Sequence, residues 1–285
     1  MSENKLIKAI KEKGQTMEAE MSFFDHLEAL RWHLVRSAVA IVIFTSLAFY
    51  FYDFLFDTII MGPSKPDFWT YRMLCRLGDW LHRDGFCITK INISLLNTEM
   101  AGQFTLMINS ALLVGITAGF PYLLWEIWRF IKPALHEKER KAARGFVAYA
   151  TGLFVLGVLF GYYVITPESI NFLSSFTVSS SIENKFSVDS YLSSVATLTL
   201  ATGVVFELPI IVYVLSSLGI LTQKFMRETR RYAVVVILII AAVVTPTPDM
   251  MTMTVVSIPL FILYEVGILV AGVVERRKLA RENAA

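Results

Sequence analysis

The stretch that decides the fold is FPYLLWEIWRFIKPALHEKER, residues 120–140, which passes from an apolar run into a dense cluster of charge. Pro121 and Pro133 bracket an aromatic middle that includes Trp125, Trp128 and Phe130. Aromatic rings collect at a membrane–water boundary, and basic residues follow on the cytoplasmic side. This stretch is therefore expected to leave the membrane in its second half and to form part of a cytosolic surface.

Composition places the chain in the membrane class. Of its 285 residues, 55% are hydrophobic and only 18% are charged, and the mean hydropathy is +0.57. Soluble domains carry about 25% charged residues, so this balance favours several membrane spans over one large soluble core. The net charge of +2 says little about partners, and no nucleic acid is expected among them. The predicted fold is all-α, with residues 1–285 forming a single membrane domain.

Six apolar runs predict six transmembrane helices, at about residues 34–56, 104–131, 145–167, 195–219, 232–245 and 253–274. About 20 apolar residues cross the hydrocarbon core of a bilayer. Residues 1–33 are expected to form a polar tail and then an amphipathic helix at the interface, because Phe23, Leu27 and Leu30 recur at helical spacing. No small-residue cleavage site follows the first apolar run, so the first span is expected to act as a signal anchor.

The distribution of Lys and Arg predicts the orientation. With the N-terminus in the cytosol, the inner segments 1–36, 132–144, 219–231 and 275–285 hold 19 basic residues, and the outer segments 57–103, 168–194 and 246–252 hold 6. Positively charged loops remain on the cytoplasmic side. Both termini are therefore expected in the cytosol, and the protein is expected in the inner membrane of a bacterium.

The fifth span is short. Tyr232 to Val244 is 13 residues, or about 20 Å of helix against a hydrocarbon core of about 30 Å. Thr-Pro-Thr-Pro at 245–248 then ends the helix, because proline lacks the backbone donor. We expect the last two spans to form a short hairpin at which the bilayer is thinned.

Two acidic residues fall inside predicted spans. Glu207 lies near the middle of the fourth span, in Phe-Glu-Leu-Pro, and Glu265 lies nearer the cytosolic end of the sixth. A charged group at the bilayer centre is costly and marks a functional site unless it only locks helices together through a hydrogen bond. Both interpretations remain open. For Glu126, with Arg129 three residues on, an ion pair along the helix face is expected.

The sequence gives no sign of an enzyme. All four histidines fall outside the predicted spans, and no His pair has metal-ligand spacing. No nucleophile motif or phosphate-binding glycine loop occurs, and Asp249 stands alone at an outer turn. No cofactor or metal is therefore expected. From these features, one candidate function is a proton-coupled small-molecule permease with Glu207 as its protonated site.

Cys75 and Cys87 are the only cysteines, and both fall in the outer segment 57–103. That compartment is oxidising, so a disulfide between them is predicted, with two free thiols as the alternative.

Carboxylates also occur at the basic cytosolic face. Glu28 lies in the segment before the first span, and Glu137 and Glu139 follow the second. Carboxylates can bind guanidinium groups through paired hydrogen bonds, although such charges are more often simply solvated.

Eight motifs follow one another in a recognisable order across residues 22–275. They are SFFDHLEALR (22–31), TEMAGQF (98–104), the opening stretch 120–140, FGYYVITP (160–167), FELP (206–209), RRYAVVV (230–236), TPTPDM (245–250) and IPLFILYE (258–265). Together they resemble TatC, the multispanning receptor subunit of the twin-arginine protein translocase.

The resemblance implies six helices in a cupped bundle and a receptor for folded proteins that carry twin-arginine signal peptides. It implies single-span TatA- and TatB-type partners, a homo-oligomeric receptor complex in the lipid bilayer, and export driven by the proton gradient. It assigns signal-peptide binding to Glu28, Arg31, Phe130 and Glu139, and partner contact in the membrane to Glu207, with Glu265 as a second intramembrane polar residue.

One departure from the family pattern affects this site. The family usually carries its functional glutamate at the position of Ala29, and Glu28 lies one residue earlier, about 100° around a helix. Other departures are Trp125-Glu126 in place of Tyr-Gln, and a lengthened Thr-Pro-Thr-Pro-Asp. If Glu28 is a weak substitute, Glu139 must carry more of the arginine recognition.

Overall fold

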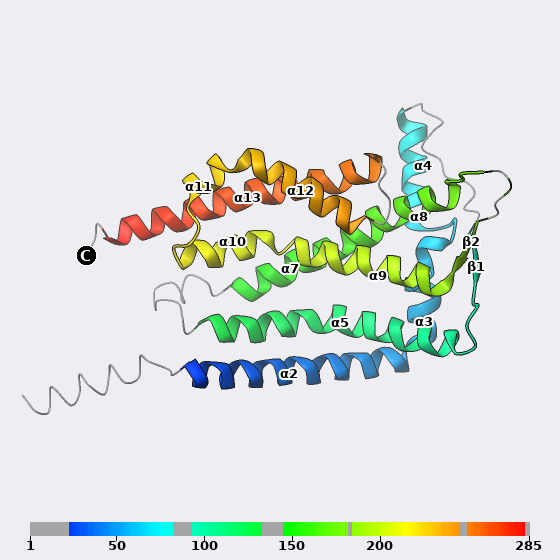
Figure 1. Ribbon diagram of the computed structural model, residues 1–285, viewed down its shortest axis with the longest axis horizontal. Helices are drawn as coiled ribbons and strands as arrows, with labels where there is room; N and C mark the ends of the chain where they lie inside the picture. Colours follow the sequence, from blue (N-terminus) through cyan, green and yellow to red (C-terminus); the bar gives the residue numbers. More distant parts are fainter. Residues whose placement is uncertain are drawn as a thin grey trace, which may run out of the picture.

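The computed structural model describes residues 23–81, 93–132, 145–179, 181, 184–245 and 250–282. Within them the long helices lie side by side along one axis (Figure 1). The long helices are α2 (Phe23–Tyr50), α5 (Gly102–Ile131), α7 (Phe146–Phe160), α9 (Val188–Val205), α10 (Leu208–Ser217), α12 (Arg230–Val244) and α13 (Met250–Glu282). Shorter elements are α3 (Tyr52–Phe54), α4 (Trp69–Leu81), α8 (Thr166–Ser175), α11 (Gln223–Glu228), β1 (Ser94–Leu96) and β2 (Lys185–Ser187).

Five segments of this bundle are long and apolar enough to cross a membrane. They are residues 30–50, 102–131, 146–175, 188–217 and 252–280. A sixth apolar helix, α12, has only 15 residues, or about 22 Å. Its partner α13 has 33 residues and extends past the rest of the bundle in Figure 1. α13 continues beyond the predicted sixth span 253–274 into the basic residues that follow it. The short fifth helix is confirmed, and the thinning of the bilayer at this hairpin stays a prediction.

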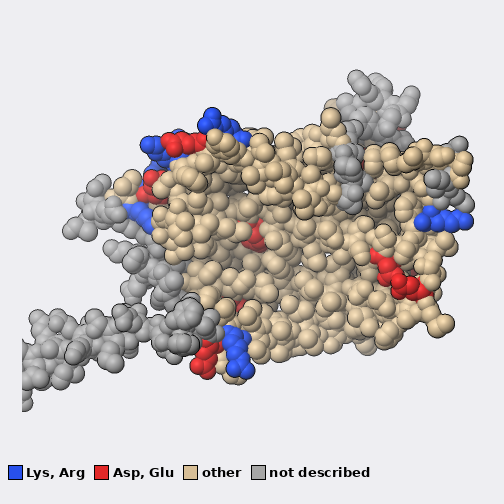
Figure 2. Space-filling model, in the orientation of Figure 1, with Lys and Arg blue, Asp and Glu red and all other residues tan. Residues whose placement is uncertain are grey.

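The two ends of the bundle differ. α4, β1 and β2 lie at one end, here called the α4 end, while α11, the start of α2 and the end of α13 lie at the other, the α11 end (Figure 1). Both ends of the described chain are therefore on the same side of the bundle. Figure 2 shows the charged side chains gathered toward the two ends, with a mostly uncharged surface between them.

The first helix is continuous. The segment before the first span does not form a separate helix along the interface, because α2 runs from Phe23 to Tyr50 in one piece of 28 residues. It ends at Tyr50 and, after a turn at Phe51, is followed by α3 and a π-helical turn, Leu55–Ile60. The predicted amphipathic helix and the first span are thus one rod, so a side chain near Glu28 moves with the span.

The fourth span is broken in its middle. α9 ends at Val205 and α10 begins at Leu208, so Phe206 and Glu207 lie at the junction rather than inside one helix. Pro209 occupies the first turn of α10, where proline is tolerated because its missing N–H would be unpaired anyway. The amides of Ile210 and Ile211 donate to the Glu207 carbonyl at 2.9 and 3.0 Å and start the new helix.

α2 and α5 approach closely at two glycines spaced four residues apart. A Cβ at Gly115 would lie 2.8 Å from the backbone Cα of Thr45, and one at Gly119 would lie 3.1 Å from the Ile41 side chain. Small residues four apart let helix backbones come together in membranes, where packing rather than the hydrophobic effect drives association. Gly115 therefore sets the α2–α5 distance.

The main core lies between α9, α12 and α13. Its buried residues are Ile165, Leu198, Phe206, Ile237, Ala241, Val256, Leu260 and Leu263. A second cluster closes the α4 end, and there the hydroxyl of the buried Tyr191 donates to the carbonyl of Ile60 at 2.7 Å. The segments predicted as outer loops thus contribute to the packed structure.

The α4 end contains regular structure that the sequence did not reveal. β1 and β2 pair as a two-stranded parallel ladder, with Leu95 opposite Phe186. The hydroxyl of Tyr71, a fully buried residue of α4, donates to the carbonyls of Pro63 and Pro167 at 2.9 and 3.3 Å. Burial raises the pKa of this phenol. The predicted outer loops 57–103 and 168–194 are therefore joined to each other and to the bundle.

We predict that Gly115→Ala destabilises the protein, by about 1–3 kcal/mol, because the new methyl group overlaps the backbone of α2. Gly152→Ala is the matched control, because a Cβ there meets nothing within 4 Å. Thermal unfolding in detergent should show a lower midpoint for the first variant and an unchanged or higher one for the second. Equal midpoints would contradict the close contact.

Candidate functional site

The predicted signal-peptide residues that the structure describes lie where α2 begins and α5 ends, at the α11 end of the bundle (Figure 1). Glu28 and Arg31 are both exposed on the first turns of α2. Phe130 lies on the last turn of α5 and is partly buried. Its ring meets the edge of the His33 imidazole, with 6.1 Å between centroids. The structure thus brings Phe130 to the helix that carries Glu28.

A hydrogen-bonded group around Glu126 ties the two helices together. Glu126 is only 1% exposed, and its Oε2 accepts a hydrogen bond from Nδ1 of His33 on α2. Its Oε1 accepts from the Tyr122 hydroxyl at 2.9 Å and from the Arg129 guanidinium at 3.3 Å. Buried carboxylates are stable only when donors surround them in this way. The cluster His33–Tyr122–Glu126–Arg129 is therefore a structural lock between α2 and α5.

Aromatic contacts fix the end of α5. The guanidinium carbon of Arg129 lies 5.0 Å from the ring centroid of Trp125, which is a cation–π contact. Trp128 is buried and stacks on Phe146 of α7 at 4.0 Å between centroids. The prediction that Glu126 pairs with Arg129 is confirmed. These contacts hold the last turn of α5 rigid beneath the surface that displays Phe130.

The lock also decides which carboxylates are available to a ligand. Glu126 already accepts three hydrogen bonds and is closed to solvent, so an incoming guanidinium cannot use it. Glu28 is exposed, and no ion pair or hydrogen bond of its side chain lies within the described part of the chain. Arg129 is partly neutralised by Glu126, which lowers the repulsion that a cationic ligand would meet at this end.

Several predicted site residues lie outside the described residues. They are Glu139 in the segment 133–144, Asp249 in the segment 246–249, and Cys87 in the segment 82–92. Cys75 is disulfide-bonded, and its pairing with Cys87 stays a prediction. Position 29 belongs to α2, one residue after Glu28.

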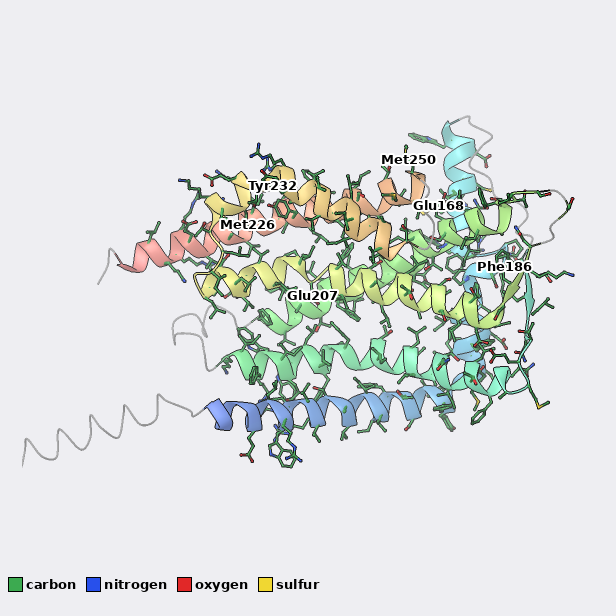
Figure 3. The ribbon with its side chains drawn as sticks, viewed as in Figure 1. Glu168, Phe186, Glu207, Met226, Tyr232 and Met250 are labelled. Atoms are coloured by element: carbon green, nitrogen blue, oxygen red, sulfur yellow. The ribbon has the colours of Figure 1, made fainter. Side chains whose placement is uncertain are left out.

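Glu207 lies midway along the bundle, at the α9–α10 junction (Figure 3). Its side chain is 5% exposed, and neither carboxyl oxygen has a hydrogen-bond partner among the described residues. An unpaired buried polar group costs about 1–3 kcal/mol, and a charged one costs more. Glu207 therefore does not lock described helices together by a hydrogen bond, which was the alternative to a functional role.

Glu265 has an intramolecular partner. Its Oε2 accepts from the Arg230 guanidinium at 2.6 Å, and the two side chains are 33% and 50% exposed. Next to it on α13, the Tyr264 hydroxyl donates to the Met226 carbonyl at 2.7 Å. These contacts tie the start of the short helix α12 and the end of α11 to α13. A helix-locking role is thus the better interpretation of Glu265.

His33 is the residue that sequence reasoning missed. It was placed outside the spans, yet it lies within the candidate span 30–50 and lines the α2–α5 contact. The sequence feature that could have pointed to it is Glu126, because an acidic side chain in an apolar run requires a hydrogen-bond donor. Its partner lies 93 residues away in sequence, and helix spacing alone does not reveal such a pair. No group of three metal-ligand side chains occurs in the ranges that the structure describes.

These features define a multi-pass α-helical membrane protein with a polar surface, built on two locked helices, at one end. A sequence model of the family described as Sec-independent protein translocase protein (TatC) matches residues 25–259. The chain belongs to this TatC family, so the predicted resemblance is confirmed, as is the all-α fold with six membrane helices. Membership makes it a component of a protein translocase.

Similar proteins cover nearly the whole chain. The TatC protein of Blattabacterium sp. subsp. Periplaneta americana is 38% identical over 261 residues, 91% of this chain and 98% of that protein. The Aquifex aeolicus TatC protein is 30% identical over 93% of this chain and 100% of its own length. A crystal structure of the twin-arginine translocase receptor TatC in DDM has a TM-score of 0.67 and 30% identity, and the match covers 86% of this chain and 99% of that one.

We predict that His33→Ala lowers the free energy of unfolding by about 1–3 kcal/mol, because it leaves the buried Glu126 without its donor from α2. Arg31→Ala, two residues away and exposed, should change it little. The double variant His33→Leu/Glu126→Leu should regain most of the loss, since it removes both polar partners. Thermal or denaturant unfolding in detergent measures all three, and equal stability of the two alanine variants would contradict the lock.

Proposed function

We propose that this protein is the signal-peptide receptor of a twin-arginine translocase in the cytoplasmic membrane of a bacterium. It binds the signal peptides of folded cargo proteins at the α11 end, which faces the cytosol. It assembles with copies of itself and with TatA- and TatB-type single-span subunits, and the proton gradient drives export. Its own role is recognition, without covalent chemistry.

The surface at the α2–α5 junction carries this proposal. The two signal arginines bind carboxylates through paired hydrogen bonds, at Glu28 on the exposed face of α2 and at Glu139 in the segment after α5. Phe130 receives the apolar residues that follow the arginines, and the lock at Glu126 keeps Phe130 and Glu28 in a fixed relation. Arg31, exposed one turn after Glu28, limits how an incoming cation approaches.

The orientation is supported by the charges of the described residues. Most Lys and Arg side chains belong to the α11 end, in the first turns of α2, the end of α5, α11, the start of α12 and the end of α13. The described part of the α4 end carries Lys65, Arg72, Arg76 and Lys185. By the positive-inside rule, this distribution supports a cytosolic α11 end.

Glu207 is the proposed contact for a single-span partner. A buried carboxyl group without a donor in the described chain favours a polar group on another transmembrane helix. A proton-coupled permease would also use such a residue. Family membership and the exposed carboxylate of Glu28, on the helix whose His33 meets Phe130, favour the translocase, because a permease does not need them.

We predict that Glu139→Gln weakens crosslinking of a twin-arginine signal peptide by about tenfold to a hundredfold, because loss of one charge-assisted contact is worth about 1.5–3 kcal/mol. Glu28→Gln should weaken it less, since Glu28 is displaced from the family position. Glu228→Gln is the matched control, because this exposed glutamate at the same end pairs only loosely with Lys224, at 3.9 Å. Unchanged crosslinking in Glu139→Gln would remove that residue from the site.

Glu207→Ala is expected to reduce copurification of the single-span partners by about tenfold. This is the effect expected from losing one hydrogen bond to a charged group. Signal-peptide crosslinking should persist, because the arginine site lies at the α11 end. Thr199→Val is the control. Its hydroxyl, about two turns earlier on α9, is likewise buried without a partner in the described chain, and removing it should leave copurification intact. Equal effects of the two substitutions would argue against a specific role for Glu207.

A further inference from the structure

Helix α4 runs across the direction of the spans rather than along it. In Figure 1 it runs across the direction of the spans and projects beyond the bundle at the α4 end. Its first turn is anchored, since the hydroxyl of Thr70 donates to the Tyr163 carbonyl and the Trp69 ring meets Tyr163 edge-on at 5.6 Å. A helix that crosses the ends of the spans has the direction expected of a helix lying along a membrane surface.

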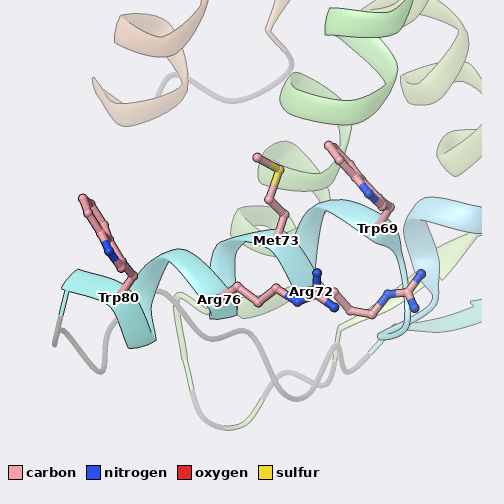
Figure 4. A pocket seen from close by; sticks show the side chains of 5 residues that line it. All are labelled: Trp69, Arg72, Met73, Arg76 and Trp80. Atoms are coloured by element: carbon pink, nitrogen blue, oxygen red, sulfur yellow. The ribbon is translucent and has the colours of Figure 1, made fainter.

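The two faces of α4 have different surroundings. Tyr71 and Gly78 are buried and Leu74 and Cys75 are partly buried, so this face packs on the protein. The opposite face is exposed and carries Trp69, Arg72, Met73, Arg76 and Trp80. Figure 4 shows Trp69, Met73 and Trp80 pointing to the same side of the helix, with Arg72 and Arg76 along its flank. These five side chains line one shallow pocket.

The apolar part of this face continues onto the outside of the bundle. Trp80 is 78% exposed and Trp69 is 54% exposed. Trp69 also lines a second pocket with Leu156 and Leu159, which are exposed apolar residues on the outer face of α7 within the candidate span 146–175. Exposed apolar side chains on a membrane span are suited to contact with lipid chains, so the Trp side of α4 adjoins a surface suited to the membrane.

The two arginines supply a charge that matches a lipid headgroup. Arg72 and Arg76 lie one turn apart, both are exposed, and neither forms an ion pair within the described ranges. Trp prefers the headgroup region of a bilayer, and Arg beside it can reach the phosphates from an apolar stem. Adjacent stripes of Trp and Arg on one helix face are thus suited to an anionic membrane surface.

We propose that α4 is an interfacial helix that binds anionic phospholipids of the leaflet at the α4 end. Trp69, Met73 and Trp80 insert at the level of the headgroups, and Arg72 and Arg76 bind the lipid phosphates. The packed face around Tyr71 fixes the depth of the helix relative to the spans. This lipid contact is independent of the proposed signal-peptide site, which lies at the opposite end of the bundle.

The test uses the full chain in nanodiscs of phosphatidylcholine that contain a minor share of phosphatidylglycerol. A photoreactive benzoylphenylalanine replaces Trp80, and intact-mass spectrometry after illumination identifies any attached lipid. Phospholipid adducts are expected, with the phosphatidylglycerol share raised about twofold or more above its share in the disc, because each nearby Arg attracts anionic lipid.

Charge variants in the same photoreactive protein separate the arginines from the fold. Arg72→Gln/Arg76→Gln should return the phosphatidylglycerol share to that of the disc, and Arg72→Lys/Arg76→Lys should keep it raised. Arg227→Gln, which removes a positive charge at the other end of the bundle, should leave the enrichment unchanged. An absence of lipid adducts, or adducts in bulk proportion before any arginine is changed, would overturn the proposal.

Discussion

The close contact between α2 and α5 is the interaction on which the proposed binding surface depends. Gly115 and Gly119 let the two backbones approach, and at the α11 end the same pair of helices is joined by His33 and Glu126. Packing without side-chain bulk sets the distance, and hydrogen bonds to a buried carboxylate set the rotation of one helix against the other. Glu28 and Phe130 therefore have fixed relative positions although they belong to different spans.

Three acidic residues of the membrane-spanning part show different ways of accommodating a carboxyl group in an apolar medium. Glu126 is surrounded by three donors, and Glu265 pairs with Arg230 at the edge of the bundle. Glu207 is buried at a helix break and has no donor among the described residues. Because charge is costly in an apolar medium, the first two stabilise the fold, while the third depends on a group that the described chain does not supply.

The spans were predictable because length and hydropathy act locally, and the short α12 could be read from Pro246 and Pro248. Features that depend on distant residues were not. The continuity of α2, the break before Leu208, the pairing of β1 with β2 and the His33–Glu126 contact each need the tertiary arrangement. At the candidate site, the resemblance named Glu28 and Phe130, which the structure places on α2 and α5. The contact of His33 with Glu126 spans 93 residues and could not be inferred from helix spacing.

The parallel pairing of β1 with β2 has a consequence for the order in which this protein assembles. Its partners, such as Leu95 and Phe186, are separated by the whole of α5, α7 and α8. A ribosome delivers the chain from its N-terminus, so in the proposed orientation β1 and α4 cross the membrane well before β2 has been made. The pairing of β1 with β2 at the α4 end therefore forms only after two further membrane helices have been inserted and have returned the chain to the side of β1.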